Sequence, residues 1–165
     1  MQTHGKTLRA EVTPTLQILG AYVAGDAMGG LLEFALGGAG GGGVIREIRI
    51  YDKDNEKAAC KLYLFDGTAA PTAVDDADPF AAGLTEADLK NLLFSEDLPY
   101  VAFAAADFMT FTVTGGATAA VAGHDGLGID YQAPSGKIRG YLVPDATPTY
   151  TAANDLTVVI TAWAN

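Results

Sequence analysis

Short segments in which apolar residues occupy every second position run through this chain, and each is bounded by turn residues such as glycine, proline or aspartate. In VIREIRIYD (44–52), Val44, Ile48 and Ile50 fall on one face, and Ile45 falls on the other with Glu47, Arg49 and Tyr51. Period two and β-branched side chains are typical of a strand and not of a helix. The same pattern predicts strands over 31–36, 58–66, 100–105, 107–113, 127–133, 137–143 and 155–163.

Eight or more short strands in a chain of 165 residues favour an all-β fold with a single well-cored domain. We expect a β-sandwich, jelly-roll-like, over residues 15–165. Residues 1–14 are expected to form an N-terminal arm or the first strand. The pattern leaves the connectivity of the strands open.

Two local features accompany the strands. The turn DKDNEK (52–57) separates two alternating segments, and we expect it to join them into a β-hairpin. The segment LTEADLKNLL (84–93) breaks the β pattern with leucines around a polar face, and Thr85 with Asp88 gives a capped start. It predicts one short helix in a long connection.

The glycine run at 37–43 formally contains the dinucleotide-binding pattern G-x-G-x-x-G, at Gly38, Gly40 and Gly43. That pattern binds phosphate only where the glycines follow a strand and open a helix, because the helix N-terminus supplies the N–H groups. Here a strand pattern follows Gly43. We therefore expect an inter-strand loop, or a place of close backbone packing, and no nucleotide cofactor.

The chain is acidic, with 10 Lys plus Arg against 20 Asp plus Glu and a formal net charge of −10. Nucleic-acid binding and anionic membrane surfaces are disfavoured, because both need clustered cations. No apolar run approaches the roughly 20 residues that span a bilayer, and the N-terminus lacks the apolar segment of a signal peptide. We expect a soluble chain that is not secreted.

Two acidic stretches resemble parts of a metal site. Asp52, Asp54, Asn55 and Glu56 place oxygen atoms at near-alternate positions, as Ca²⁺ prefers, but the turn glycine, the distal glutamate and the flanking helices of an EF-hand are missing. The acidic stretch DDADP (75–79) also resembles part of a calcium site and lacks the same features. Both are expected to be solvated turns, and no metal ligand is predicted.

No constellation of catalytic residues stands out. His4 lies near the N-terminus and His124 lies beside Asp125 in a glycine-rich turn, which by itself is only a turn. The nucleophiles available to a triad are Ser95, Ser135 and Cys60, none of which lies in a known signature. Cys60, the single cysteine, is expected to be a small buried side chain of a strand. We expect a protein that is not an enzyme, with no catalytic and no cofactor-binding residues.

Three stretches of the chain resemble small virion proteins of tailed bacteriophages. A Tyr-x-x-Gly-Asp-x-x-Gly-Gly segment precedes the glycine loop, the next strand pair ends in Leu-Phe-Asp, and a late Thr-Pro-Thr-Tyr leads into the final strand. The resemblance covers about residues 13 to 161. Its matching positions here are Tyr22, Gly25, Asp26, Gly29, Gly30, Leu64, Phe65, Asp66, Thr147, Pro148, Thr149 and Tyr150.

The resemblance implies a head decoration or cement protein that clamps the outside of an icosahedral capsid and binds its major capsid protein. An acidic surface agrees with an exterior position, since a protein facing packaged DNA benefits from positive charge. Such a protein would be made in the host cytoplasm and reside in the virion. Small all-β modules also tend to associate through edges or apolar patches, so a homo-oligomer, a dimer or trimer, is expected.

Two other functions remain open. A tail or fibre-associated virion protein would use the same fold. A carbohydrate-binding or hydrolytic β-sandwich would need exposed aromatics, for which Tyr131, Tyr141 and Trp163 are the candidates. Ordinary burial preferences place those three side chains in the core or in an interface instead.

Overall fold

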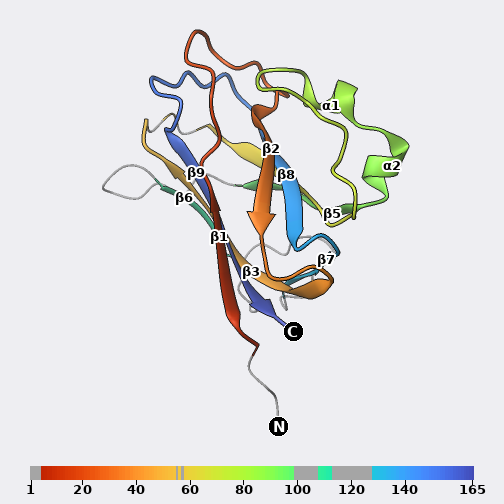
Figure 1. The fold of residues 1–165 in the computed structure, drawn as a ribbon. Coiled ribbons are helices and arrows are strands. Elements are labelled where there is room, and N and C mark those ends of the chain that lie inside the picture. The colour runs from red at the N-terminus through yellow and green to blue at the C-terminus, as the bar shows by residue number, and fades with distance from the viewer. Residues whose placement is uncertain (1–4, 55, 57, 99–107, 113–127) are drawn as a thin grey trace.

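The computed structural model describes residues 5–54, 56, 58–98, 108–112 and 128–165, and these residues form two packed β-sheets with two single-turn helices (Figure 1). The strands are β1 (Thr7–Val12), β2 (Met28–Ala35), β3 (Gly41–Asp52), β4 (Cys60–Phe65), β5 (Leu92–Leu98), β6 (Phe108–Thr112), β7 (Ile129–Ala133), β8 (Lys137–Pro144) and β9 (Leu156–Ala164). The helices are α1 (Phe80–Gly83) and α2 (Glu86–Leu89). The expected strand at 100–105 lies outside the described residues.

The order of the strands is that of a jelly roll. One sheet runs β1-β9-β3-β6, with β7 also paired to β3, and the other runs β2-β8-β4-β5. Every pairing is antiparallel, and β1 with β9, β2 with β8, β3 with β6 and β4 with β5 form nested pairs. This nesting is what results when one long hairpin is wound into two sheets. The expectation of a jelly-roll-like β-sandwich is confirmed, and residues 7–12 of the N-terminal segment are its first strand.

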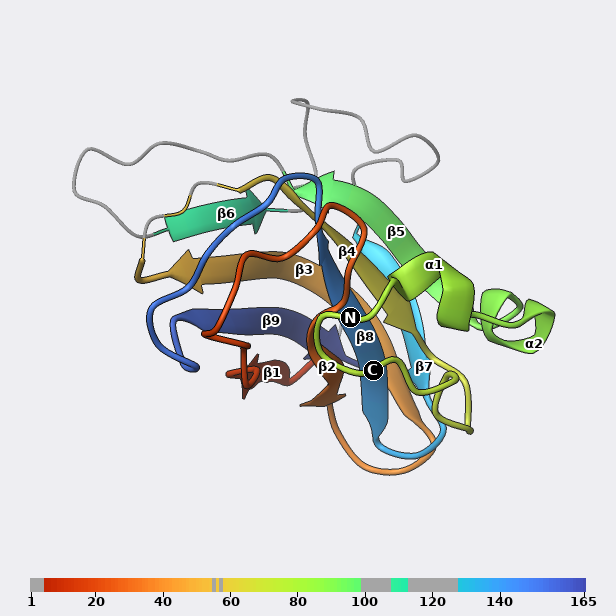
Figure 2. The ribbon, with the colours of Figure 1, turned by 90° about the horizontal axis from the view of Figure 1, so that it is seen from above.

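The core lies between the two sheets, which Figure 2 shows as two layers seen from above. Apolar side chains that alternate along each strand point inward, as period two requires. The largest fully buried side chains are Tyr22, Tyr141, Tyr150, Phe34, Met28, Leu32, Leu36, Ile45, Ile48, Ile50, Leu62 and Leu64.

A β-bulge in β3 corrects the predicted faces of that strand. Ile45 pairs with Ala162 of β9, whereas Glu47 pairs with Thr161, so that one extra residue, Arg46, is inserted. A bulge shifts the inward phase by one residue. Ile45 is therefore buried together with Ile48, three residues later, and the prediction that Ile45 lies on the opposite face was wrong.

The strands on either side of the 52–57 turn do not form the predicted hairpin. β3 pairs with β6, β7 and β9, whereas β4 pairs with β5 and β8 in the other sheet. Each of the two strands has one buried face, and in a sandwich such faces can pack against each other across the core instead of side by side. Because adjacent strands in sequence here belong to opposite sheets, the connection crosses from one sheet to the other.

The connection 66–91 packs on the outside of the second sheet and encloses a smaller apolar cluster formed by Ala27, Phe65, Val74, Phe80, Tyr141 and Val143. The helix predicted over 84–93 is only the single turn α2, a second single turn, α1, precedes it, and Leu92 already begins β5. The predicted cap is present: Thr85 Oγ1 accepts from the Asp88 N–H, and the Asp88 carboxylate accepts from the Thr85 N–H. The helix ends early because Leu92, which pairs with Phe65 of β4, begins β5.

Candidate binding surface

Three connections meet at one end of the sandwich, which Figure 1 shows at the top: 13–27 between β1 and β2, 53–59 between β3 and β4, and 145–155 between β8 and β9. Backbone hydrogen bonds tie them together, from Leu16 to Ala153 (3.0 Å), Tyr22 to Pro148 (2.9 Å), Gly25 to Pro144 (3.0 Å), Lys53 to Asp155 (2.9 Å) and Asp145 to Ala59 (2.8 Å), the first of each pair donating. The 13–27 connection is thus fixed to its neighbours along its length.

Tyr22 anchors this connection from inside. Its side chain is fully buried, its O–H donates to Asp76 Oδ1 at 2.6 Å, and its oxygen accepts from the Gln17 N–H at 2.9 Å. The same Asp76 oxygen accepts from the Gly29 N–H at 2.6 Å. Burial first, and then the hydrogen bond to Asp76, raises the pKa of Tyr22 well above its ordinary value, so the phenol stays protonated and keeps donating.

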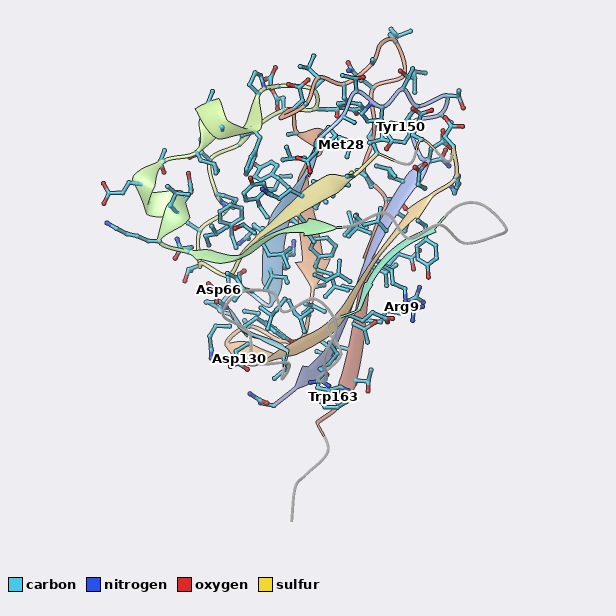
Figure 3. All side chains as sticks on the ribbon, turned by 180° about the vertical axis from the view of Figure 1, so that it is seen from behind. Arg9, Met28, Asp66, Asp130, Tyr150 and Trp163 are labelled. Carbon is cyan, nitrogen blue, oxygen red and sulfur yellow. The ribbon has the colours of Figure 1, made fainter. Side chains whose placement is uncertain are left out.

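A second aromatic ring supports the anchor. Tyr150 is buried and packs edge-on against Tyr22 with 6.1 Å between ring centroids, and Figure 3 shows it among the loops of this end. Such an arrangement of rings is favourable beyond the area that it buries. The 13–27 connection therefore joins the core through an aromatic pair.

Three apolar side chains of this anchored segment are left in solvent. Leu19 is 97% exposed, Val23 62% and Ile18 49%. We call residues 17–25, which carry all three, the apolar loop. A single exposed apolar residue is ordinary, but three within six positions of a segment held by a buried tyrosine make this segment our candidate interaction surface.

The acidic residues around this end have structural partners. Asp54 accepts from the N–H (2.6 Å) and the Oγ1 (3.0 Å) of Thr151, and Glu56 accepts from the Thr149 N–H at 2.9 Å. The bond from the Thr151 N–H is the largest of the influences that lower the pKa of Asp54. Asp52 is buried at the end of β3, so the prediction of a solvated turn was wrong for this residue. Asn55 lies outside the described residues.

The stretch 75–79 is likewise part of the framework. Asp76 holds Tyr22 and Gly29, and Asp26 forms an isolated antiparallel bridge with Pro79. Ala77 adopts a φ of 64°, and its N–H donates to the Ala27 carbonyl at 2.8 Å. The carboxylates that resembled half of a metal site here position the start of β2. Over the residues that the structure describes, no three His, Cys, Asp or Glu side chains cluster as metal ligands would.

Several of the positions that carry the sequence resemblance shape the same end. Gly29 has a φ of 74°, and a Cβ there would overlap Pro14, so only glycine fits. Asp26 accepts from the Val23 N–H at 2.9 Å, and the Pro148 carbonyl accepts from Tyr22. The remaining positions lie in the core or at loop junctions: Leu64, Phe65 and Tyr150 are buried, and Asp66 accepts from the Gln132 N–H. The resemblance therefore marks the framework: Val23 lies between two of its positions, and Ile18 and Leu19 precede the first of them, Tyr22.

The sequence patterns did not single out Ile18, Leu19 and Val23 as site residues. Their sequence, Gln-Ile-Leu-Gly-Ala-Tyr-Val, has the apolar content of a short core segment, and nothing in it separates the buried Tyr22 from the exposed Leu19. One signal was available: no period-two alternation runs through it, and two turn-favouring glycines, Gly20 and Gly25, interrupt it.

Of the residues considered for catalysis, those that the structure describes lie in separate elements. His4, His124 and Asp125 lie outside the described residues. Cys60 is fully buried, and burial first of all raises the pKa of its thiol to about 12, so it is an unreactive core residue as expected. Ser95 lies in β5, and Ser135 Oγ donates to the Lys137 carbonyl at 3.5 Å in the turn before β8.

The structure also shows where the glycine run and the three aromatic candidates lie. Residues 37–40 form a loop between β2 and β3, whereas Gly41 to Gly43 begin β3, so the run is in part the expected loop and in part a place of close backbone packing. A Cβ on Gly43 would overlap the backbone of β9. Tyr131 and Tyr141 are buried, as burial preferences suggested, whereas Trp163 is 49% exposed with Arg46 4.4 Å from its ring centroid.

Comparisons with protein families, with curated proteins and with solved structures found no match for this chain. Among the described residues, neither helix exceeds four residues, and none could cross a membrane.

Proposed function

We propose that this chain is a structural virion protein that decorates the outside of a tailed-phage head and stabilises it by bridging major capsid proteins. It acts through binding alone and is not an enzyme. The observation that carries the proposal is the apolar loop, whose exposed Ile18, Leu19 and Val23 are held by the buried Tyr22. A preorganised apolar segment binds without a further ordering cost, which is what a cement protein needs.

Three further features support this function. The resemblance to small phage virion proteins covers nearly the whole chain and concerns the framework that presents the loop. The formal net charge of −10 fits the outside of a capsid better than a surface facing DNA. A protein that binds only the assembled lattice stabilises it by mass action.

The carbohydrate-binding alternative loses most of its basis in the fold. Two of its three aromatic candidates, Tyr131 and Tyr141, are buried and cannot stack on a sugar ring. Trp163 lies far from the apolar loop, near the end of the sandwich opposite to Tyr150 (Figure 3).

The test is a titration of the purified protein onto undecorated heads, with bound copies and head melting measured together. We expect saturation at a fixed number of copies set by the lattice and a rise in the melting temperature of the heads. Leu19→Asp should weaken binding by about tenfold or more, because burying a leucine contributes about 1.5–3 kcal/mol. Leu89→Asp is the matched control, since Leu89 is an equally apolar residue, 54% exposed, on α2 and outside the apolar loop.

Three results would count against the proposal. Failure of the wild type to bind heads would exclude the decoration function, and binding restricted to tails would favour the tail or fibre protein instead. Equal loss of binding in Leu19→Asp and Leu89→Asp would show that the apolar loop is not the contact surface.

A further inference from the structure

The strand β1 lies at the edge of its sheet. It pairs with β9 on one side, and no strand of the described residues pairs with its other side. Figure 2 shows β6, β3, β9 and β1 in succession, with β1 last. An edge strand offers a row of backbone N–H and C=O groups that a second strand can use.

The register decides which residues offer those groups. The Lys6 carbonyl accepts from the Ala164 N–H at 2.9 Å, and Thr7 lies opposite Trp163 in the same pairing. In an antiparallel pair, hydrogen-bonded positions alternate with non-hydrogen-bonded ones. The even-numbered residues of β1 therefore bond to β9, and Thr7, Arg9 and Glu11 direct their N–H and C=O groups away from the sheet.

The two faces of this edge carry different chemistry. On the outer face, Arg9 and Glu11 have side chains 59% and 52% exposed and form an ion pair of 3.0 Å; Figure 3 shows Arg9 on the outer side of the sheet. On the inner face, Leu8 and Val12 are only partly buried and pack at the rim of the core on either side of Ala10. The edge thus has one cation and one anion outside, and incompletely covered apolar groups inside.

We propose that β1 pairs with β1 of a second copy of this chain, antiparallel, about a two-fold axis at Ala10. In this register Arg9 lies opposite the partner's Glu11 and Glu11 opposite the partner's Arg9, and each pair exchanges two backbone hydrogen bonds. On the inner face Leu8 lies opposite the partner's Val12, which completes the burial of both. The sheet then continues from one copy into the other.

The charges select this register over its neighbours. A shift of one residue would place the outward N–H and C=O groups of one copy opposite residues of the partner whose backbone groups already bond to β9. A shift of two would place Arg9 opposite the partner's Arg9, or Glu11 opposite the partner's Glu11, and like charges directly opposite are destabilising. Both the outer charges and the inner apolar side chains are therefore self-complementary in one and the same register, as an isologous interface requires.

The β2 edge of the other sheet suits pairing less well. Gly29 and Gly30 have φ values of 74° and 66°, and the register of β2 is interrupted between Met28 and Leu32. The segment that holds Asp76 and Ala77 already bonds to residues 27–29 at the start of this strand. Irregular backbone of this kind twists an edge away from a partner.

The test uses the purified full chain and sedimentation equilibrium over a concentration series. The wild type should be a dimer whose dissociation is concentration-dependent. Arg9→Glu and Glu11→Arg should each weaken self-association at least about tenfold, because two opposite-charge pairs become two like-charge pairs. An equimolar mixture of the two variants should recover dimers, since the like charges of one variant then face the opposite charges of the other. The double variant Arg9→Glu/Glu11→Arg should also dimerise.

Matched controls come from the exposed pair Lys90–Glu86 on and beside α2, whose side chains are 73% and 86% exposed and 3.0 Å apart. Lys90→Glu and Glu86→Arg make the same charge changes and should leave the dimer intact. A wild type that is monomeric at all concentrations would overturn the proposal, as would a mixture of the two β1 variants that stays monomeric, or controls that weaken the dimer as much. The measurement needs no capsid, so its outcome is separate from that of the decoration function.

Discussion

Removing the hydroxyl of Tyr22 is the sharpest test of how the apolar loop is held. In Tyr22→Phe the ring still fills its site beside Tyr150, but Asp76 loses a donor at 2.6 Å and the Gln17 N–H loses its acceptor at 2.9 Å. The change therefore deletes two hydrogen bonds and leaves the packing almost unaltered.

The expected loss follows from the charge of one partner. A hydrogen bond to an ionised group contributes about 1.5–3 kcal/mol, and a neutral one about 0.5–1.5 kcal/mol. Asp76 keeps the bond from Gly29, and Gln17 is only partly buried, so that water can replace part of what is lost. We expect the free energy of unfolding to fall by about 2–3 kcal/mol.

Urea unfolding followed by circular dichroism measures this difference. With a slope of about 2 kcal/mol per molar urea, the midpoint should fall by about 1 M, and the slope itself should not change. Tyr131→Phe is the control, because its hydroxyl donates to the neutral Leu36 carbonyl at a longer 3.3 Å from an equally buried site. It should cost only about 0.5–1 kcal/mol.

Equal destabilisation by Tyr22→Phe and Tyr131→Phe would contradict a strong Tyr22–Asp76 bond, since the charged partner would then contribute nothing extra. A double-mutant cycle adds a second criterion. Tyr22→Phe combined with Asp76→Asn should cost less than the sum of the two single changes by about 1 kcal/mol or more, because the two side chains share one bond. Strict additivity would show that the bond does not anchor the loop.

Three other predictions concern the framework. Gly40 has a φ of 77° with open space around it, so Gly40→Ala should lower the free energy of unfolding, measured in urea, by about 1 kcal/mol. Gly43→Ala should lower it more, because the added Cβ would overlap β9. Equal losses would count against the strand assignment of 41–43. Burial tends to raise the pKa of Asp88, but hydrogen bonds from Thr85 and Thr72 outweigh it and bring the pKa to about 2. Because this pKa lies below the unfolded value of about 3.9, the contribution of Asp88 to the stability of the fold is present above pH 4 and is lost as the pH falls from about 4 to 2. Asp88→Asn should therefore flatten that part of the plot of melting temperature against pH. Chelation by EDTA should move the melting temperature by less than about 1 °C, because the acidic turns bond to backbone N–H groups; a large drop would reveal a metal site.

Local sequence patterns were sufficient to predict much of the fold. Period-two alternation located β2, β4, β7, β8 and β9, and the Thr85 and Asp88 cap was read correctly from four residues. These features depend on side chains near in sequence, so that a short window contains the whole cause. The burial of Cys60 and the structural role of the glycine run followed in the same way.

The candidate site could not be predicted in this way. Tyr22 and Leu19 are both large and apolar in character, but one is fully buried and the other 97% exposed. The difference arises from Asp76, 54 residues further along, and from Tyr150 in the last connection. Which side chains remain exposed is thus set by contacts between distant segments.

That this chain forms short strands with one buried face each follows from its residue order alone, because the alternation that buries apolar groups involves adjacent residues. How those faces meet depends on contacts between strands that are distant in sequence. The bulge at Arg46 reversed the predicted phase of Ile45, and β3 and β4 packed across the core although a hairpin was expected between them. The alternation specifies that one face of each strand must be buried, but it does not specify which strands cover that face. Two strands with buried faces can pair side by side within one sheet or pack against each other between two sheets, and which arrangement forms depends on all the strands together.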